Sequence, residues 1–215
     1  MHSQQRGFGA CNNPRVSLIQ PSKRPTGLAF FLIIAGAIGF LAAWQLTLDK
    51  FQVLADPATK LGCDISVIVA CGPNLESWQG SVFGFPNPLL GIAGFVAPIA
   101  VGVAILARAR FARWFWMLFN LGVAGALAFV CWLIGQSIFV LGTLCPWCMV
   151  VWSVTIPMFW AVTFYNLKTG NIPAGTRGKH FFATAYGWVP LITLLNYVVI
   201  AVLAQLRLDV IGSLF

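Results

Sequence analysis

Residues 144–167 read LCPWCMVVWSVTIPMFWAVTFYNL, a pair of cysteines at the start of a run without a single charged side chain. Two residues separate Cys145 from Cys148, so their sulfurs can close a small disulfide ring. The run that follows is long enough to cross a bilayer as a helix. Unpaired N–H groups at a helix start favour a thiolate, the form of cysteine that attacks disulfides. The stretch therefore predicts a reactive dithiol at the head of a transmembrane helix.

The composition of the whole chain predicts an integral membrane protein. Of the 215 residues, 59% are hydrophobic and 8% are charged, which lies far outside the usual range for a soluble protein. A net charge of +8 would suggest nucleic-acid binding in a soluble protein, but here its distribution along the chain indicates otherwise. Six cysteines, four of them in two closely spaced pairs, indicate dithiol chemistry or metal binding rather than a disulfide-rich secreted scaffold.

Five apolar runs predict five transmembrane helices, so the expected fold class is an all-α integral membrane protein. The first run follows a basic region, as in a signal peptide, but it is too long for one and is expected to be retained. Pro157 lies inside the fourth run, where it predicts a kink. The expected spans are residues 27–48, 88–107, 115–140, 145–167 and 185–205.

The segments between the spans differ in character. Residues 1–24 are polar and basic and predict a cytoplasmic tail, in which Cys11 is expected to be a surface thiol without a role. Residues 49–87 form the longest extramembrane loop and contain Cys63 and Cys71. Residues 168–215 form a second basic loop followed by the fifth span.

The distribution of charge predicts the orientation in the membrane. The tail and the loops at 108–113 and 168–179 hold ten of the thirteen lysines and arginines and none of the five acids. By the positive-inside rule these segments face the cytoplasm, and both cysteine pairs then face outward. This orientation requires an odd number of spans, which agrees with the five found from hydropathy.

Two outward-facing cysteine pairs predict electron relay by thiol–disulfide exchange. Cys63 and Cys71 lie in a loop rich in small and β-branched residues, which is expected to be flexible and to carry one sulfur to another site. One alternative is a pair of static disulfides that hold the outer face together. A second is zinc, but the only histidines, His2 and His180, are placed inside, so no metal is expected. Cys131, within the third span, is expected to be a buried packing thiol.

The electrons need an acceptor, and the sequence contains neither a flavin or nicotinamide fingerprint nor a soluble domain to hold such a cofactor. A dithiol at the membrane surface can instead meet a lipid-soluble quinone. Asn87, at the mouth of the second span, can donate to a quinone carbonyl or else serve as a helix cap. Aromatic residues gather near the dithiol, either around such a quinone or as an interfacial belt; they are Trp78, Phe83, Phe85, Trp147 and Trp152.

The order of these motifs resembles the vitamin K epoxide reductase family, and in particular bacterial members of the actinobacterial type without a fused thioredoxin domain. The resemblance covers about residues 27–167. It rests on Cys63 and Cys71 with seven residues between them, then Ser77, then FGFPNPLLG at 83–91, and then CPWC at 145–148. The bacterial disulfide-bond protein B family uses similar chemistry with the CxxC motif in the earlier loop, and that order is the reverse of the one in this chain.

The resemblance implies a four-helix transmembrane bundle, residues 25–167, around a quinone (menaquinone or another membrane quinone), with a fifth helix added at the C-terminal end. It also implies a short surface helix within the loop at 49–87. A secreted thioredoxin-fold protein would pass electrons to Cys63 and Cys71, Cys71 would exchange with Cys145, and Cys148 would react with the quinone.

The implied quinone site contains further residues. Asn87 would hydrogen-bond the quinone, Ser77 would position the loop, and Phe83, Trp147 and Trp152 would surround the site. Trp152 stands where vertebrate members carry a tyrosine, and an indole N–H can donate a hydrogen bond but cannot accept one. The sequence therefore predicts a bacterial, multi-pass membrane enzyme that forms disulfides in exported proteins with a separate thioredoxin-fold thiol oxidase as partner. The alternative is a non-enzymatic membrane scaffold with structural disulfides.

Overall fold

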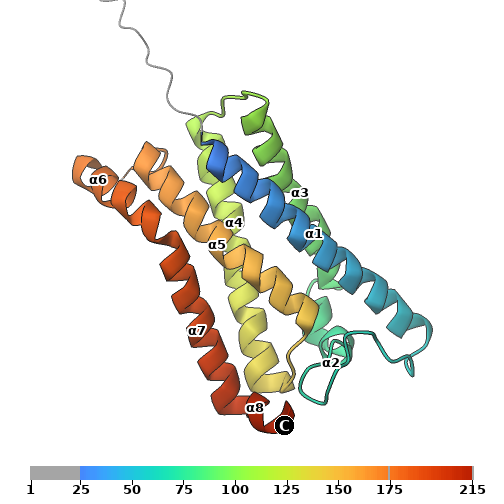
Figure 1. Cartoon of the computed structure of the whole chain (residues 1–215). Helices are drawn as coiled ribbons and strands as arrows, with labels where there is room; N and C mark the ends of the chain where they lie inside the picture. Colours follow the sequence, from blue (N-terminus) through green and yellow to red (C-terminus); the bar gives the residue numbers. More distant parts are fainter. Residues whose placement is uncertain (1–24, 174, 215) are drawn as a thin grey trace, which may run out of the picture.

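The computed structural model describes residues 25–173 and 175–214, which form long helices joined by short connections (Figure 1). The predicted tail, residues 1–24 with Cys11, lies outside the described residues. Five helical segments of the described chain are long and apolar enough to cross a membrane, which confirms the prediction of an all-α membrane protein. These segments are Thr26–Ala55, Asn87–Leu106, Arg113–Leu141, Pro146–Thr169 and Arg177–Leu208.

Short helical turns alternate with the long helices along the chain. In chain order, the elements are α1 (Thr26–Ala55), α2 (Gly72–Glu76), η1 (Trp78–Ser81), α3 (Asn87–Leu106), α4 (Arg113–Gly135), the π-helical turn η2 (Gln136–Leu141), α5 (Pro146–Thr169), α6 (Gly175–Ala185), η3 (Tyr186–Trp188), α7 (Val189–Leu208) and α8 (Val210–Leu214). The short helix expected within the outer loop is α2.

Proline and glycine set several helix boundaries close to where the sequence predicts them. Pro88 and Pro146 lie in the first turns of α3 and α5, where a missing N–H breaks no helical hydrogen bond. Gly142 and Gly170 end η2 and α5 with φ values of 69° and 80°, which a residue without a Cβ adopts without strain.

Helix α1 departs from the prediction. It continues to Ala55, about two turns beyond the expected end of the first span at residue 48. Because the helix continues, Asp49 and Lys50 do not begin the outer loop but lie on the helix, where both side chains are buried. The C-terminal end of α1 therefore forms one wall of the region that holds the cysteines.

The bundle is built around close contacts of α1 with α3 and α5, and of α5 with α4 (Figure 1). Glycines allow α1 and α3 to approach each other. A Cβ on Gly39 would overlap the ring of Phe95, and one on Gly102 would come within 2.7 Å of the carbonyl oxygen of Ala29. Small residues at helix interfaces are the usual way for membrane helices to pack tightly.

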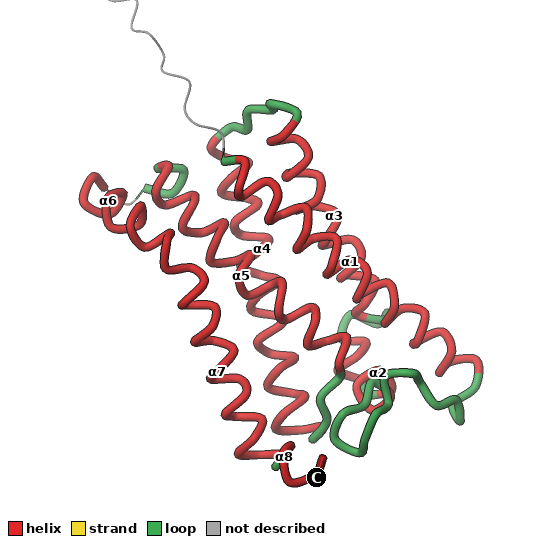
Figure 2. The backbone as a smooth tube through the Cα atoms, viewed as in Figure 1, coloured by secondary structure: helices red, strands yellow, loops and turns green. Residues whose placement is uncertain are grey.

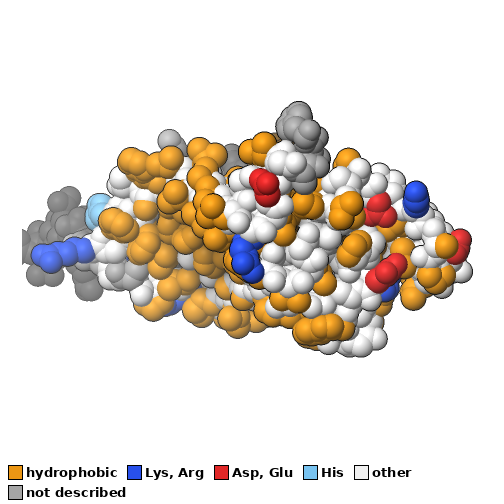
Figure 3. Space-filling view, turned by 90° about the horizontal axis from the view of Figure 1, so that it is seen from below, with side chains coloured by type: hydrophobic (Ala, Val, Ile, Leu, Met, Phe, Trp, Pro, Cys, Tyr) orange, Lys and Arg blue, Asp and Glu red, His pale blue; other side chains and the backbone are white. Residues whose placement is uncertain are grey.

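The outer surface of the bundle is strongly apolar. Many large hydrophobic side chains of α1, α3, α4 and α7 are exposed, and orange hydrophobic surface is prominent on the face drawn in Figure 3. A bilayer would cover such a surface with lipid tails. Cys131 belongs to it, because its side chain is exposed on α4. The prediction that Cys131 is buried was therefore wrong.

The two ends of the bundle differ in charge. The α3–α4 and α5–α6 connections lie at one end, and α2, the η2–α5 connection and α8 lie at the other (Figure 2). The first end carries basic residues and the second carries acids; the former include Arg108, Arg110, Arg113 and Lys168, and the latter Asp56, Asp64, Glu76 and Asp209. By the positive-inside rule, the first end is predicted to face the cytoplasm.

Candidate redox site

The fold brings the two cysteine pairs together at the acidic end of the bundle. Cys63 and Cys71 form a disulfide, whereas Cys145 and Cys148 are free thiols. The sulfur of Cys145 lies 3.5 Å from the sulfur of Cys71, and both residues are fully buried. In this structure Cys71 is bonded to Cys63 and in contact with Cys145.

Backbone pairing holds Cys71 beside Cys145. Val69 and Leu144 form an isolated parallel β-bridge, although they are far apart in the sequence. The N–H of Leu144 donates to the carbonyl of Ile68 at 2.7 Å, and the N–H of Ala70 donates to the carbonyl of Leu144 at 3.1 Å. Because each cysteine directly follows one of the bridged segments, the bridge fixes the position of one sulfur relative to the other.

Side chains anchor the rest of the loop. Asp64 accepts hydrogen bonds from the backbone N–H groups of Cys71 at 2.8 Å, of Gly72 at 3.1 Å and of Leu61 at 3.2 Å. Asn74 donates to the hydroxyl of Thr143 at 2.9 Å. The sequence predicts a flexible loop, but in this redox state hydrogen bonds hold the segment on both sides of Cys71.

The start of α5 favours a thiolate at Cys145. Cys145 is the N-cap residue of the helix, and its sulfur accepts a hydrogen bond from the backbone N–H of Cys148 at 3.3 Å. A hydrogen bond from the Cys148 side chain, together with backbone N–H groups, lowers the pKa of the Cys145 thiol despite its burial. Cys145 is thus both the thiol next to the disulfide and the more readily ionised member of its pair.

A large apolar cavity lies beside this site. Its volume is about 800 Å³, and α3, α4 and α5 contribute most of its lining. Along α4 the lining extends from Phe115 to Leu133, a distance of about 27 Å at 1.5 Å per residue. Cys148 lines the end of the cavity nearest the disulfide. The cavity is therefore long, apolar and in contact with one sulfur of the CxxC motif.

The cavity brings together some of the residues predicted from the sequence and leaves others outside. Phe83, Asn87 and Trp152 line it. Ser77 and Trp147 are not among the described residues that line it: Ser77 donates to the carbonyl of Asn74, and Trp147 packs against the buried cysteines.

Asn87 is held by the loop in front of it. Its Nδ2 donates to the carbonyl of Gln79 at 2.6 Å, and its Oδ1 accepts from the N–H of Val82 at 3.1 Å. An amide nitrogen carries two hydrogens, so Asn87 can donate one hydrogen bond besides that to Gln79. The residue therefore anchors the loop and brings a second potential donor to the cavity lining.

Gln79 is a cavity residue that the sequence analysis missed. Its Nε2 donates to Gln136 Oε1 at 3.2 Å, but its own Oε1 is buried without a hydrogen-bond partner. A buried acceptor without a partner is costly unless a ligand supplies a donor. Asn87 can donate to the carbonyl oxygen of a quinone, and Gln79 Oε1 can accept from the O–H of the corresponding hydroquinone. The two residues therefore fit a quinone and its reduced form. No local sequence signal marks Gln79, because its role arises only when η1 and η2 meet.

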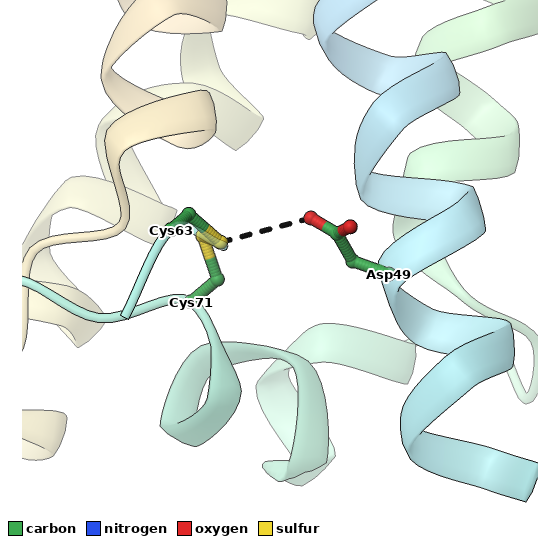
Figure 4. A group of neighbouring side chains, drawn as sticks. All are labelled: Asp49, Cys63 and Cys71. Atoms are coloured by element: carbon green, nitrogen blue, oxygen red, sulfur yellow. Dashed lines mark hydrogen bonds between the residues drawn. A yellow bond between two sulfur atoms is a disulfide. The ribbon is translucent and has the colours of Figure 1, made fainter. Parts of the chain in front are cut away.

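Asp49 is a second residue that the sequence analysis did not connect to the cysteines. Figure 4 shows its carboxylate pointing from α1 toward the Cys63–Cys71 disulfide, and Oδ2 lies 3.6 Å from the sulfur of Cys63. One ligand-type atom from each of these three residues lies within 4.8 Å of the others. The two sulfurs are bonded to each other and are not thiolates, so the group in this state is not a zinc site.

The fold and the site define a membrane-embedded thiol–disulfide oxidoreductase: two cysteine pairs in contact, one beside an apolar cavity. Comparison with known families agrees with this class. The vitamin K epoxide reductase family matches residues 30–163, and the chain belongs to that family. Its members are quinone-linked disulfide oxidoreductases of helical membrane fold. No curated protein matches the chain.

Proposed function

We propose that the protein is a quinone-dependent oxidoreductase of a bacterial cell membrane, which forms disulfide bonds in exported proteins by oxidising a separate thioredoxin-fold partner. Its N-terminus lies in the cytoplasm, and both cysteine pairs face outward. The observation that carries the proposal is the placement of the CxxC sulfurs. Cys145 lies 3.5 Å from the Cys63–Cys71 disulfide, whereas Cys148 lines the apolar cavity.

Each cysteine takes part in a different step of the thiol–disulfide relay. The partner's thiols reduce the Cys63–Cys71 disulfide, and Cys63 is the member they attack because it is the less buried of the two, 7% exposed against 0% for Cys71. The Cys71 thiolate then attacks Cys145 of an oxidised CxxC pair and releases Cys148 toward the cavity. Cys63 next attacks Cys71, which restores the outer disulfide and releases Cys145. Each exchange breaks one disulfide and forms one.

The cavity residues hold the electron acceptor. A bound quinone takes up two electrons and two protons and supplies the oxidising power of the relay. Asn87 offers a donor for a quinone oxygen, and Gln79 Oε1 offers an acceptor for an O–H of the hydroquinone that forms, with Phe83 and Trp152 beside them. The apolar length of the cavity suits an isoprenoid tail, which favours menaquinone or another membrane quinone. Ser77 acts indirectly, by fixing the loop through its bond to Asn74.

The test uses the purified protein in lipid nanodiscs, with dithiothreitol as reductant and a short-chain menaquinone as acceptor. Quinone absorbance reports turnover, and mass spectrometry after acid quench and alkylation reports which cysteines are bonded. Replacing Cys148→Ser is expected to abolish turnover, because quinone can then no longer form the Cys145–Cys148 disulfide that accepts electrons from Cys71. The matched control is Cys131→Ser, because Cys131 lies on the outer surface of α4 and should not affect the rate.

The scaffold alternative gives a different result in the same assay. Structural disulfides would stay oxidised whether or not quinone is present, and the wild-type protein would consume no quinone. Turnover by the Cys148→Ser variant at the wild-type rate would also overturn the proposal.

A further inference from the structure

The carboxylate of Asp49 touches a sulfur atom that must exchange a proton during the relay. Its Oδ2 lies 3.6 Å from the sulfur of Cys63, and the side chain is 4% exposed (Figure 4). In the disulfide, Cys63 has no proton to donate, so the contact becomes a hydrogen bond only when Cys63 is released as a thiol. Gln45 donates to the other carboxylate oxygen, Oδ1, at 2.9 Å, which leaves Oδ2 turned toward the sulfur.

We propose that Asp49 is a catalytic residue that accepts the proton of Cys63 when Cys63 attacks Cys71, and returns it when Cys63 is next released. This inference rests on the proposed function, because it assigns a proton acceptor to one of its exchange steps. The structure corresponds to the product of that step: Cys63 is bonded to Cys71, and the free sulfur of Cys145 lies 3.5 Å away.

The step balances without another reagent. The proton of the Cys63 thiol moves to Asp49 Oδ2, and the Cys63 thiolate forms a bond to the sulfur of Cys71. The Cys71–Cys145 bond breaks, and its electron pair leaves on Cys145, whose thiolate the N–H of Cys148 stabilises. One disulfide replaces another, so no oxidant is consumed. When the partner's second thiol later displaces Cys63, the leaving thiolate recovers the proton from Asp49.

The other charged and titratable groups around Asp49 have different partners or roles. On α1 itself, Lys50 donates to the carbonyl of Leu75 at 2.6 Å. From the loop, the carboxylate of Asp64 is occupied by three backbone N–H groups. Among the described residues, Cys71, Cys145 and Cys148 are the other titratable groups packed around the site, and all three are sulfurs of the relay. Asp49 is therefore the carboxylate placed to serve Cys63.

The experiment compares Asp49→Asn with wild type in the nanodisc assay from about pH 6 to about pH 9.5. Without the carboxylate, the proton of Cys63 must leave to solvent before Cys63 can attack, a requirement that eases as the pH rises. The variant is expected to turn over about 100-fold more slowly at pH 7, with the deficit shrinking toward pH 9. During turnover at pH 7 it should accumulate the Cys71–Cys145 disulfide with Cys63 free.

Two further variants separate chemistry from folding. Asp49→Glu keeps a carboxylate and is expected to recover most of the rate at pH 7. Asp56→Asn makes the same chemical change at an exposed position just beyond α1 and should leave the rate unchanged.

The inference is overturned if Asp49→Asn matches the wild-type rate, or if its deficit is equal at all pH values and no Cys71–Cys145 species accumulates. A failed proposed function gives another pattern, because the wild-type protein would then show no quinone-linked turnover at all.

Discussion

Replacing Gln79→Met should change ligand-free stability and hydroquinone binding in opposite directions. Gln79 is buried, and its Oε1 has no partner. A buried acceptor without a hydrogen-bond partner lowers the free energy of unfolding by about 1–3 kcal/mol, whereas the hydrogen bond from Gln79 Nε2 to Gln136 raises it by about 1 kcal/mol. Methionine has a similar length and removes both, so the free energy of unfolding of the ligand-free protein should rise by roughly 0–2 kcal/mol.

The effect on hydroquinone binding follows from the same oxygen atom, because Gln79 Oε1 can accept a hydrogen bond from a hydroquinone O–H but not from a quinone carbonyl. Loss of one net hydrogen bond to the hydroquinone, about 1.4 kcal/mol, weakens affinity about tenfold. At a hydroquinone concentration of about 100 times the wild-type Kd, bound ligand stabilises the wild type by about 2.7 kcal/mol and the variant by about 1.4 kcal/mol. The increase in Tm caused by hydroquinone should therefore fall to about half.

The assay is thermal unfolding in detergent, followed by tryptophan fluorescence with and without short-chain menaquinone kept in its hydroquinone form. Thr193→Val is the matched control, because Thr193 Oγ1 is also buried without a partner but lies on α7, away from the cavity. It should leave the hydroquinone-induced shift intact. An unchanged shift in Gln79→Met, or a ligand-free variant less stable than wild type by more than about 2 kcal/mol, would refute the reasoning.

Two further predictions concern the CxxC motif and the helix packing. In the reduced protein, alkylation of Cys145 should level off at a lower pH than that of an ordinary cysteine thiol, because its lowered pKa makes the thiolate present at lower pH. Cys148→Ala removes the main hydrogen-bond donor and should move the midpoint for Cys145 upward, as measured by mass spectrometry. Gly39→Ala should lower the free energy of unfolding by about 1–3 kcal/mol, because the added Cβ overlaps Phe95 across the α1–α3 interface; the measurement is a lower Tm. Gly27→Ala is the control and should be nearly neutral, because Gly27 has open space around it.

Hydropathy and residue spacing were sufficient for the architecture. The five spans are confirmed because an apolar run of transmembrane length is a local property of the chain. The order of the cysteine motifs led to the correct family for the same reason. Cys131 shows where hydropathy stops being informative: an apolar position in a membrane helix can face lipid as easily as the bundle interior.

Residues of the site could be predicted from the sequence only where a single segment contains the motif that indicates them. Phe83, Asn87 and Trp152 were expected near the quinone and line the cavity, whereas their roles there stay predictions. Gln79 depends on where η1 meets η2, and Asp49 on the two additional turns of α1. The charges at 49 and 50 suggested the end of the span, but burial among other side chains overrode that local signal.

The bridge between Val69 and Leu144 allows side chains near Cys71 to be substituted without moving the sulfurs. Its hydrogen bonds use only main-chain groups, so they do not depend on which side chains occupy the segment. Ile65 and Val67 lie on the same segment with 70% and 91% of their surface exposed. Substitutions there can reshape this exposed face while the sulfurs keep their spacing, so under the proposed function partner choice could evolve separately from the chemistry.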